Sequence, residues 1–169
     1  MTQTTYITNN SRQTKNLGRK FGETLRGGET LCLYGALGSG KTTFTQGLAR
    51  GLQIKNRLLS PTFIIVRHYN IINKPFTKLY HLDLYRLENP QSVMDLGFID
   101  FINDKTNVIV IEWPEKLGEF LPKNRIDIYF KDLGDDKREI SIKKFEAQNP
   151  KSLPAGRQAK QTQMKKILK

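Results

Sequence analysis

The chain has little cysteine and no long apolar run. Its 169 residues include a single cysteine, Cys32. A disulfide framework is therefore excluded, and Cys32, which lies inside an apolar stretch, is expected to be a buried small residue in a reducing compartment. No stretch approaches the roughly 18 apolar residues of a membrane span, and the first residues lack the charged and apolar parts of a signal peptide. The sequence therefore predicts a cytoplasmic protein with no membrane association.

Acidic side chains are also scarce compared with basic ones. The chain has 28 Lys and Arg against 16 Asp and Glu, a formal net charge of +12. The excess lies in residues 1–60, with nine basic and two acidic side chains, and in residues 146–169, with six basic and one acidic. Such a balance favours polyanionic partners, with simple solubility as the alternative.

The length predicts one domain with a proper core. Residues 1–145 alternate apolar runs typical of strands with stretches of helical spacing, whereas residues 146–169 are polar and basic and are expected to be disordered. The expected helices begin near Ser11 and at residues 42 and 98, with a short one ending at Gly97. The expected strands cover residues 6–8, 30–34, 63–70, 78–83, 107–112, 125–131 and 138–144. The apolar run at 107–112 predicts a central strand, and 63–70 and 78–83 are expected to pair as a hairpin.

One segment matches the phosphate-binding loop pattern G-x-x-x-x-G-K-[ST] in full. The segment consists of Gly35, Ala36, Leu37, Gly38, Ser39, Gly40, Lys41 and Thr42. Glycines allow backbone N–H groups to face phosphate oxygens, the lysine supplies a charge for the β- and γ-phosphates, and the threonine hydroxyl can ligate Mg²⁺. An expected strand precedes the segment and an expected helix follows it. The sequence therefore predicts a nucleotide triphosphate site.

A phosphate loop needs an acidic partner that organises the metal ion and the water. Glu112 and Asp83 each end an apolar strand-like run, and the strand ends of an α/β sheet meet at one edge. Both carboxylates are therefore candidates for that role. Thr62, in the Ser-Pro-Thr segment after the expected helix, is a candidate γ-phosphate sensor. Trp113 is expected to be a core or interface aromatic, and His81 is expected to pack or pair at a strand surface.

Three classes of function remain in view after these motifs. A GTPase is disfavoured because the Asn-Lys at 73–74 is not followed by the Asp of a guanine reader, and no Asp has a Gly three residues later. A small-molecule kinase is weakened because Arg86 is the only arginine between Asp83 and Glu112. An ATPase, such a kinase, and a basic RNA-binding module without important catalysis stay open.

Four segments together resemble one family. They are Gly35 to Thr43, Ser60-Pro61-Thr62-Phe63, His81-Leu82-Asp83-Leu84-Tyr85-Arg86-Leu87 and Ile111-Glu112-Trp113-Pro114. In this order they resemble the TsaE (YjeE) proteins, the ATPase component of the bacterial tRNA threonylcarbamoyladenosine system. The likeness covers roughly residues 4 to 144, and the basic tail lies outside it.

The resemblance implies an α/β, P-loop NTPase-like three-layer fold with a mixed, mainly parallel central sheet and antiparallel strands at the edge. It implies an ATP- and Mg²⁺-dependent ATPase, weak alone, that supports a TsaB–TsaD complex in threonylcarbamoyl transfer to adenosine 37 of ANN-decoding tRNAs. Contact with tRNA would be indirect, through that complex. The residue roles that it implies are phosphate binding by 35–43, metal binding by Thr42 and Glu112, metal or water positioning by Asp83, switching by Thr62, and nucleotide contacts by Ser11 and Arg138.

Overall fold

A computed structural model of the chain describes residues 3–61, 64–72 and 74–145. Seven strands form one sheet: β1 (Gln3–Thr8), β2 (Thr30–Tyr34), β3 (Val66–Asn70), β4 (Lys78–Asp83), β5 (Asn107–Glu112), β6 (Arg125–Gly134) and β7 (Lys137–Phe145). The helical elements are α1 (Ser11–Thr24), α2 (Lys41–Gly51), α3 (Gln91–Met94), α4 (Phe98–Asn103) and the 3₁₀ segment η1 (Pro114–Phe120). The described elements end with β7, and the expected tail lies outside the described residues.

The sheet is parallel in its centre and antiparallel toward both edges. Its strand order is β1-β7-β6-β2-β5-β4-β3. The pairs β6–β2, β2–β5 and β5–β4 are parallel, whereas β1–β7, β7–β6 and β4–β3 are antiparallel. β5 is an interior strand and all its residues are buried. The expected mixed sheet, the hairpin of β3 and β4 and the central place of β5 are therefore confirmed.

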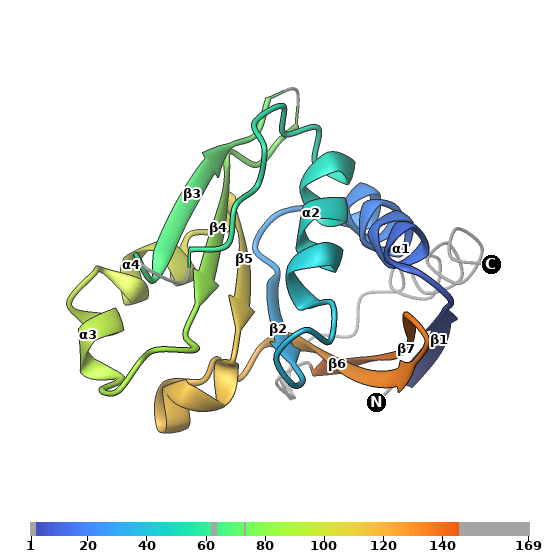
Figure 1. Cartoon of the computed structure of the whole chain (residues 1–169). Helices are drawn as coiled ribbons and strands as arrows, with labels where there is room; N and C mark the ends of the chain where they lie inside the picture. Colours follow the sequence, from blue (N-terminus) through green and yellow to red (C-terminus); the bar gives the residue numbers. More distant parts are fainter. Residues whose placement is uncertain (1–2, 62–63, 73, 146–169) are drawn as a thin grey trace.

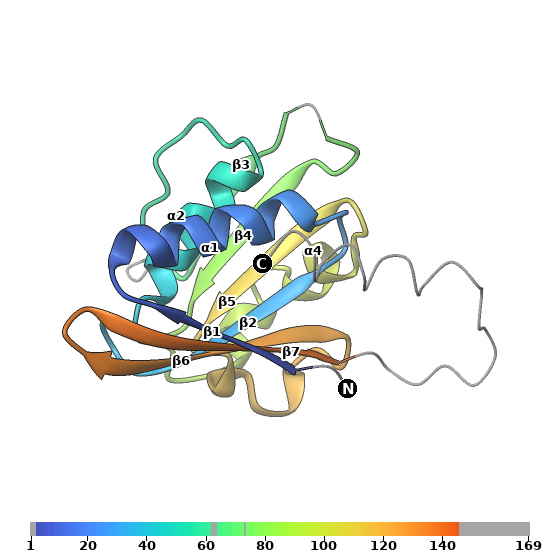
Figure 2. The same ribbon diagram turned by 90° about the vertical axis from the view of Figure 1, so that its right-hand side faces the viewer.

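Helices cover both faces of the sheet and make three layers (Figure 1). α1 and α2 lie on one face, over a large apolar cluster that includes Phe21, Phe44 and Leu48. α3, α4 and η1 lie on the other, over a smaller cluster that includes Phe98 and Ile111. A view turned by 90° shows α1 running above the antiparallel β1, β6 and β7 (Figure 2). The phosphate loop joins β2 to α2 at the carboxyl end of the parallel strands, which is where ligands of α/β sheets bind.

Several boundaries differ from those expected from the sequence, among them the start of the first strand, which begins at Gln3 and not at residue 6. The strand predicted to begin at residue 63 begins at Val66, because the backbone N–H groups of Ile64 and Ile65 both donate to the carbonyl of Pro61. This turn takes Ile64 and Ile65 out of the strand, although both are strong strand formers. The last two strands extend further than predicted, to Gly134 and from Lys137, because they pair almost up to their connecting turn.

α1 and α2 touch backbone to backbone through glycines. A Cβ atom built at Gly47 would lie 1.9 Å from the carbonyl oxygen of Lys15, and one built at Gly18 would lie 2.1 Å from that of Phe44. The contact is continued one turn later in each helix by Gly22 and Gly51. Any side chain at these positions would push the helices apart. The four glycines therefore set the distance between α1 and α2, the helix that follows the phosphate loop.

Replacement of Gly47 by alanine is expected to lower the free energy of unfolding by about 3 kcal/mol, because the added methyl group overpacks a backbone contact that has no room to relax. In an exposed helix the same change would stabilise by about 1 kcal/mol. Denaturant unfolding followed by circular dichroism measures the effect. Gln46→Ala, one residue earlier in α2, is the matched control and is expected to change the stability by less than about 0.5 kcal/mol. Equal stability of Gly47→Ala and the native chain would contradict the close contact.

Cys32 is fully buried in β2, as expected. Burial raises the pKa of its thiol, with a further contribution from the nearby Asp127 carboxylate. Since the thiolate is the reactive form, this cysteine is an inert core residue. In the described part of the chain, no helix is both long and apolar enough to cross a membrane.

Candidate functional site

The phosphate loop takes its shape from glycines and from the strand it follows. Gly40, at the N-terminus of α2, has φ 102°, a left-handed conformation that favours glycine. A Cβ atom there would also lie 2.8 Å from Nε of Arg138. Position 40 therefore favours glycine because of its backbone conformation, and a side chain there would also displace Arg138. The loop brings Lys41 and Thr42 to the first turn of α2, where the helix dipole favours a bound anion.

A cavity of about 190 Å³ lies between this loop and the ends of β4 and β5. Its lining residues come from the loop and from the opposite wall: Leu37, Gly38, Ser39, Gly40, Lys41, Thr42, Thr43, Ser60, Asp83, Tyr85, Glu112 and Trp113. Most of the residues expected from the sequence to bind phosphate or metal therefore share one cavity. Gly35 and Ala36 do not line the cavity, but their carbonyl oxygens accept hydrogen bonds from Nζ of Lys41, which does.

The two acids that end β4 and β5 lie side by side. The strands are parallel neighbours, and Asp83 pairs in register with Glu112. Both carboxylates point to the sheet face that carries α2, and their residues are only 5% and 2% exposed. His81, two residues before Asp83, shares that face because side chains alternate along a strand. The pairing register of β4 with β5 thus brings three ionisable side chains together at the start of α2.

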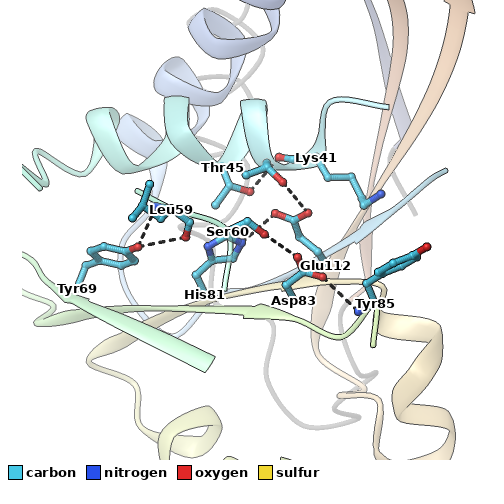
Figure 3. A network of polar contacts seen from close by, with 10 residues as sticks. Lys41, Thr45, Leu59, Ser60, Tyr69, His81, Asp83, Tyr85 and Glu112 are labelled. Atoms are coloured by element: carbon cyan, nitrogen blue, oxygen red, sulfur yellow. Dashed lines mark hydrogen bonds and ion pairs between the residues drawn. The ribbon is translucent and has the colours of Figure 1, made fainter. Parts of the chain in front are cut away.

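Glu112 is held by two side chains, one on each carboxylate oxygen. Oγ1 of Thr42 donates to Oε2 at 3.0 Å. Nε2 of His81 lies 2.9 Å from Oε1 (Figure 3). His81 is fully buried, and its Nδ1 has no hydrogen-bond partner among the described residues. A proton on Nδ1 would therefore be unsatisfied, so the tautomer that fits is the neutral ring with Nε2–H donating to Glu112. The sequence prediction placed His81 at a strand surface; the structure corrects this to a buried residue that orients Glu112.

Asp83 is fixed by the segment that follows α2 and by its own chain. Oγ of Ser60 donates to Oδ2 at 2.6 Å, and the backbone N–H of Tyr85 donates to Oδ1 at 3.2 Å (Figure 3). Ser60 thereby ties the segment before β3 to the wall of the cavity. Thr62, the expected switch residue two positions later, lies outside the described residues.

Lys41 turns its ammonium onto its own loop. Nζ donates to the carbonyl oxygens of Gly35 at 2.6 Å and Ala36 at 2.9 Å, and it lies 4.2 Å from the ring centroid of Trp113. Burial lowers the pKa of Lys41, while the Glu112, Asp83 and Glu115 carboxylates act to raise it. The charged ammonium is therefore held at a cost that a polyanionic ligand would relieve.

The start of α1 and β7 meet beside the phosphate loop, outside the set of residues that line the cavity. The backbone N–H of Ser11 donates to Oδ2 of Asp136 at 3.1 Å, and the same carboxylate pairs with Nη1 of Arg138 at 2.6 Å. The Arg138 side chain packs on Gly40. Its Nε is buried and has no partner in the part of the chain that the structure describes. Ser11 and Arg138 therefore both lie near the phosphate loop, and their nucleotide contacts remain a prediction from the resemblance. Sequence reasoning did not single out Asp136, which joins them.

The cavity suits a phosphate and a hard metal ion. Oγ of Ser39 is buried, lines the cavity and lacks a hydrogen-bond partner among the described residues, so it is ready to donate to a ligand. Thr42, Glu112 and Asp83 present the hydroxyl and carboxylate oxygens that Mg²⁺ prefers. No cluster of three His, Cys, Asp or Glu side chains able to hold a metal occurs in the described ranges.

Comparison with known proteins places this chain in a family. The model of the family described as threonylcarbamoyl adenosine biosynthesis protein TsaE matches residues 8–140. The chain belongs to the TsaE family. It is 40% identical over 142 residues to the tRNA threonylcarbamoyladenosine biosynthesis protein TsaE of Bacillus subtilis, covering 84% of this chain and 86% of that protein. The protein of the same name from Rickettsia typhi is 35% identical over 137 residues, covering 80% and 92%.

A solved structure gives the same answer for the fold. The crystal structure of YdiB from Bacillus subtilis superposes with a TM-score of 0.74 at 30% identity and covers 98% of this chain and 95% of its own. The resemblance to the TsaE family and the predicted fold class are therefore both confirmed. The residue-by-residue roles that the resemblance implied remain predictions.

Proposed function

We propose that this TsaE-family chain acts in tRNA threonylcarbamoyladenosine biosynthesis as the component that binds ATP with Mg²⁺ and hydrolyses it. The observation that supports this most directly is the shared cavity. The phosphate loop forms one wall, and Asp83 and Glu112 form the other. Loop and acids come from distant parts of the sequence, and the fold joins them within hydrogen-bond distance, through Thr42 and Glu112.

Each residue has a role that follows from its position. The loop backbone, Ser39 and Lys41 would bind the phosphates, with Lys41 leaving the carbonyls of its own loop. Thr42 and Glu112, with Asp83 beside them, would hold Mg²⁺, which when bound neutralises the charge that develops on the phosphates. His81 keeps the Glu112 carboxylate in place. Catalysis would be the positioning of an in-line water in this buried site.

Ser60 connects the site to a segment able to respond to the nucleotide. Its hydroxyl bonds Asp83, and the chain then turns at Pro61 before β3. We propose that ATP and Mg²⁺ order this segment, with Thr62 as the sensor, and that hydrolysis releases it. The partner that would respond to this change is a TsaB–TsaD complex, and the chain would contact tRNA indirectly through that complex.

The experiment is a steady-state ATPase assay of the full chain, alone and with the TsaB and TsaD proteins of the same source and an ANN-decoding tRNA transcript. Hydrolysis is expected to be slow alone and to rise at least tenfold with the complete set. A parallel screen of ATP consumption with small metabolites tests the kinase alternative. A metabolite that stimulates consumption while the protein partners do not would overturn the proposal.

A further inference from the structure

The outer surface of α1 and α2 carries two adjoining basic hollows. One, of about 340 Å³, is lined by Arg12, Lys15, Arg19 and Arg50 together with two amide side chains. The other, of about 450 Å³, is lined by Lys15, Arg50, Lys55 and Arg57 and several uncharged residues. Because Lys15 and Arg50 line both hollows, the two form one continuous surface. We call the six cations Arg12, Lys15, Arg19, Arg50, Lys55 and Arg57 the basic strip.

The glycine contacts between the helices explain why the strip is continuous. The carbonyl of Lys15 lies against Gly47, and that of Arg19 lies against Gly51, so the cationic side of α1 sits directly over α2. Two helices with larger residues at these positions would stand further apart. The fold therefore concentrates like charges that a looser pair of helices would separate.

Acidic side chains do little to offset this charge. Glu23 is the only acid in α1 and α2, and it pairs with Arg19. Arg19 is also held by Oδ1 of Asn16. Like charges gathered on one surface repel one another, and a polyanion removes that repulsion. The strip is therefore a surface that an extended anion would stabilise.

The other side chains of this surface favour a nucleic acid over a membrane or a protein. Gln13, Asn16, Gln46 and Asn56 line the hollows between the cations. Amides of this kind hydrogen-bond phosphate and sugar oxygens. Neither α1 nor α2 contributes a large exposed hydrophobic residue in the described structure. A membrane-bound helix needs such residues, and a protein interface usually has an apolar anchor.

We infer that the basic strip binds the phosphate backbone of tRNA directly. The inference rests on the proposed function for the identity of the RNA, because tRNA is the molecule that the pathway modifies. It goes beyond that function, in which tRNA is reached only through the partner complex. The strip is also close in sequence to Ser11 and Ser60, which lie beside and in the nucleotide site. Arg12 follows Ser11, which bonds Asp136, and Arg57 lies three residues before Ser60, which bonds Asp83.

The test compares two charge-reversal pairs in the full chain. Lys15→Glu with Arg50→Glu removes the centre of the strip, and Lys105→Glu with Lys123→Glu changes two exposed lysines elsewhere by the same total charge. Binding of an ANN-decoding tRNA transcript is measured by fluorescence anisotropy between about 50 and 200 mM salt. The strip pair is expected to weaken binding at least tenfold and to lower the salt slope by about two, while the control pair changes affinity less than threefold.

Three further measurements make the result decisive. Circular dichroism and ATP affinity are measured for both pairs, and both are expected to stay at the native values. A second strip pair, Lys55→Glu with Arg57→Glu, lies in the loop after α2 and repeats the test without changing a helix. Weaker tRNA binding by the strip variants, with their ATP affinity unchanged, supports the inference. If the native chain binds tRNA but does not bind ATP, only the proposed function is refuted.

Other outcomes would overturn the inference. They are a native chain that does not bind tRNA, equal weakening by the strip and control pairs, and poly-glutamate competing as well as tRNA. The last would identify an acidic protein as the partner. A strip pair that alters the sedimentation of the free chain while leaving tRNA affinity unchanged would instead identify a contact between two copies.

Discussion

Replacement of Lys41 by alanine is expected to weaken ATP binding by at least about 100-fold. The ammonium is buried at the start of α2 and is the basic side chain that lines the cavity. A hydrogen bond from a buried charged donor contributes up to about 3 kcal/mol, which corresponds to that factor. Isothermal titration or a fluorescent ATP analogue measures the affinity. Lys131→Ala, on an exposed part of β6, is the matched control and is expected to bind normally.

The same variant is expected to fold as well as the native chain at neutral pH. Burial lowers the pKa of Lys41, so the folded state disfavours its charge compared with the unfolded state. For a depressed lysine pKa, the unfolded state binds more protons, and stability rises as pH increases through the folded pKa toward 10.5. At neutral pH the buried charge of Lys41 therefore lowers the stability of the folded state, and its removal takes this penalty away. An affinity unchanged in a folded Lys41→Ala protein would refute the assignment of the site.

Replacement of Glu112 by glutamine is expected to reduce ATP turnover by at least about 100-fold while ATP still binds. The amide oxygen keeps the acceptor for Nε2–H of His81, and the amide N–H group can donate to the hydroxyl oxygen of Thr42, so the local geometry survives. It lacks the negative charge needed to hold Mg²⁺, and a loss of this size corresponds to about 2.7 kcal/mol of transition-state stabilisation. The measurement is the turnover number together with the nucleotide dissociation constant. Glu115→Gln, an exposed carboxylate three residues later, is the control.

Glu112→Ala separates the chemical role from the structural one. It should lose turnover like the glutamine variant, and it also leaves Nε2–H of buried His81 without its acceptor. An unsatisfied buried donor costs about 1–3 kcal/mol, so this variant alone should unfold at a lower temperature. If both variants hydrolyse ATP at the native rate, Glu112 has no part in catalysis.

The local chemistry of the site could be predicted from the sequence because it depends on short segments. Gly35 to Thr42 carries its own backbone requirements, and an apolar strand that ends in an acid places that acid at a sheet edge. Where prediction failed, one error came from a local turn and the other from packing between distant segments. Ile64 and Ile65 left their expected strand because their N–H groups bond Pro61, and His81 is buried because it lies on the sheet face that carries α2, against Glu112. Alternation along β4 was the available signal for His81, since it shares a face with Asp83.

The sequence by itself determined the phosphate loop, the two candidate acids, the class of fold and the excess of positive charge. These follow from residue types at short spacings, which fix local conformation and chemistry. The tertiary structure decided which groups meet. Strand register set Asp83 beside Glu112, β7 placed Arg138 on Gly40, and glycine contacts brought Lys15 over α2. The physical reason is that pairing register and helix separation depend on packing between segments far apart in the chain, which no local pattern encodes.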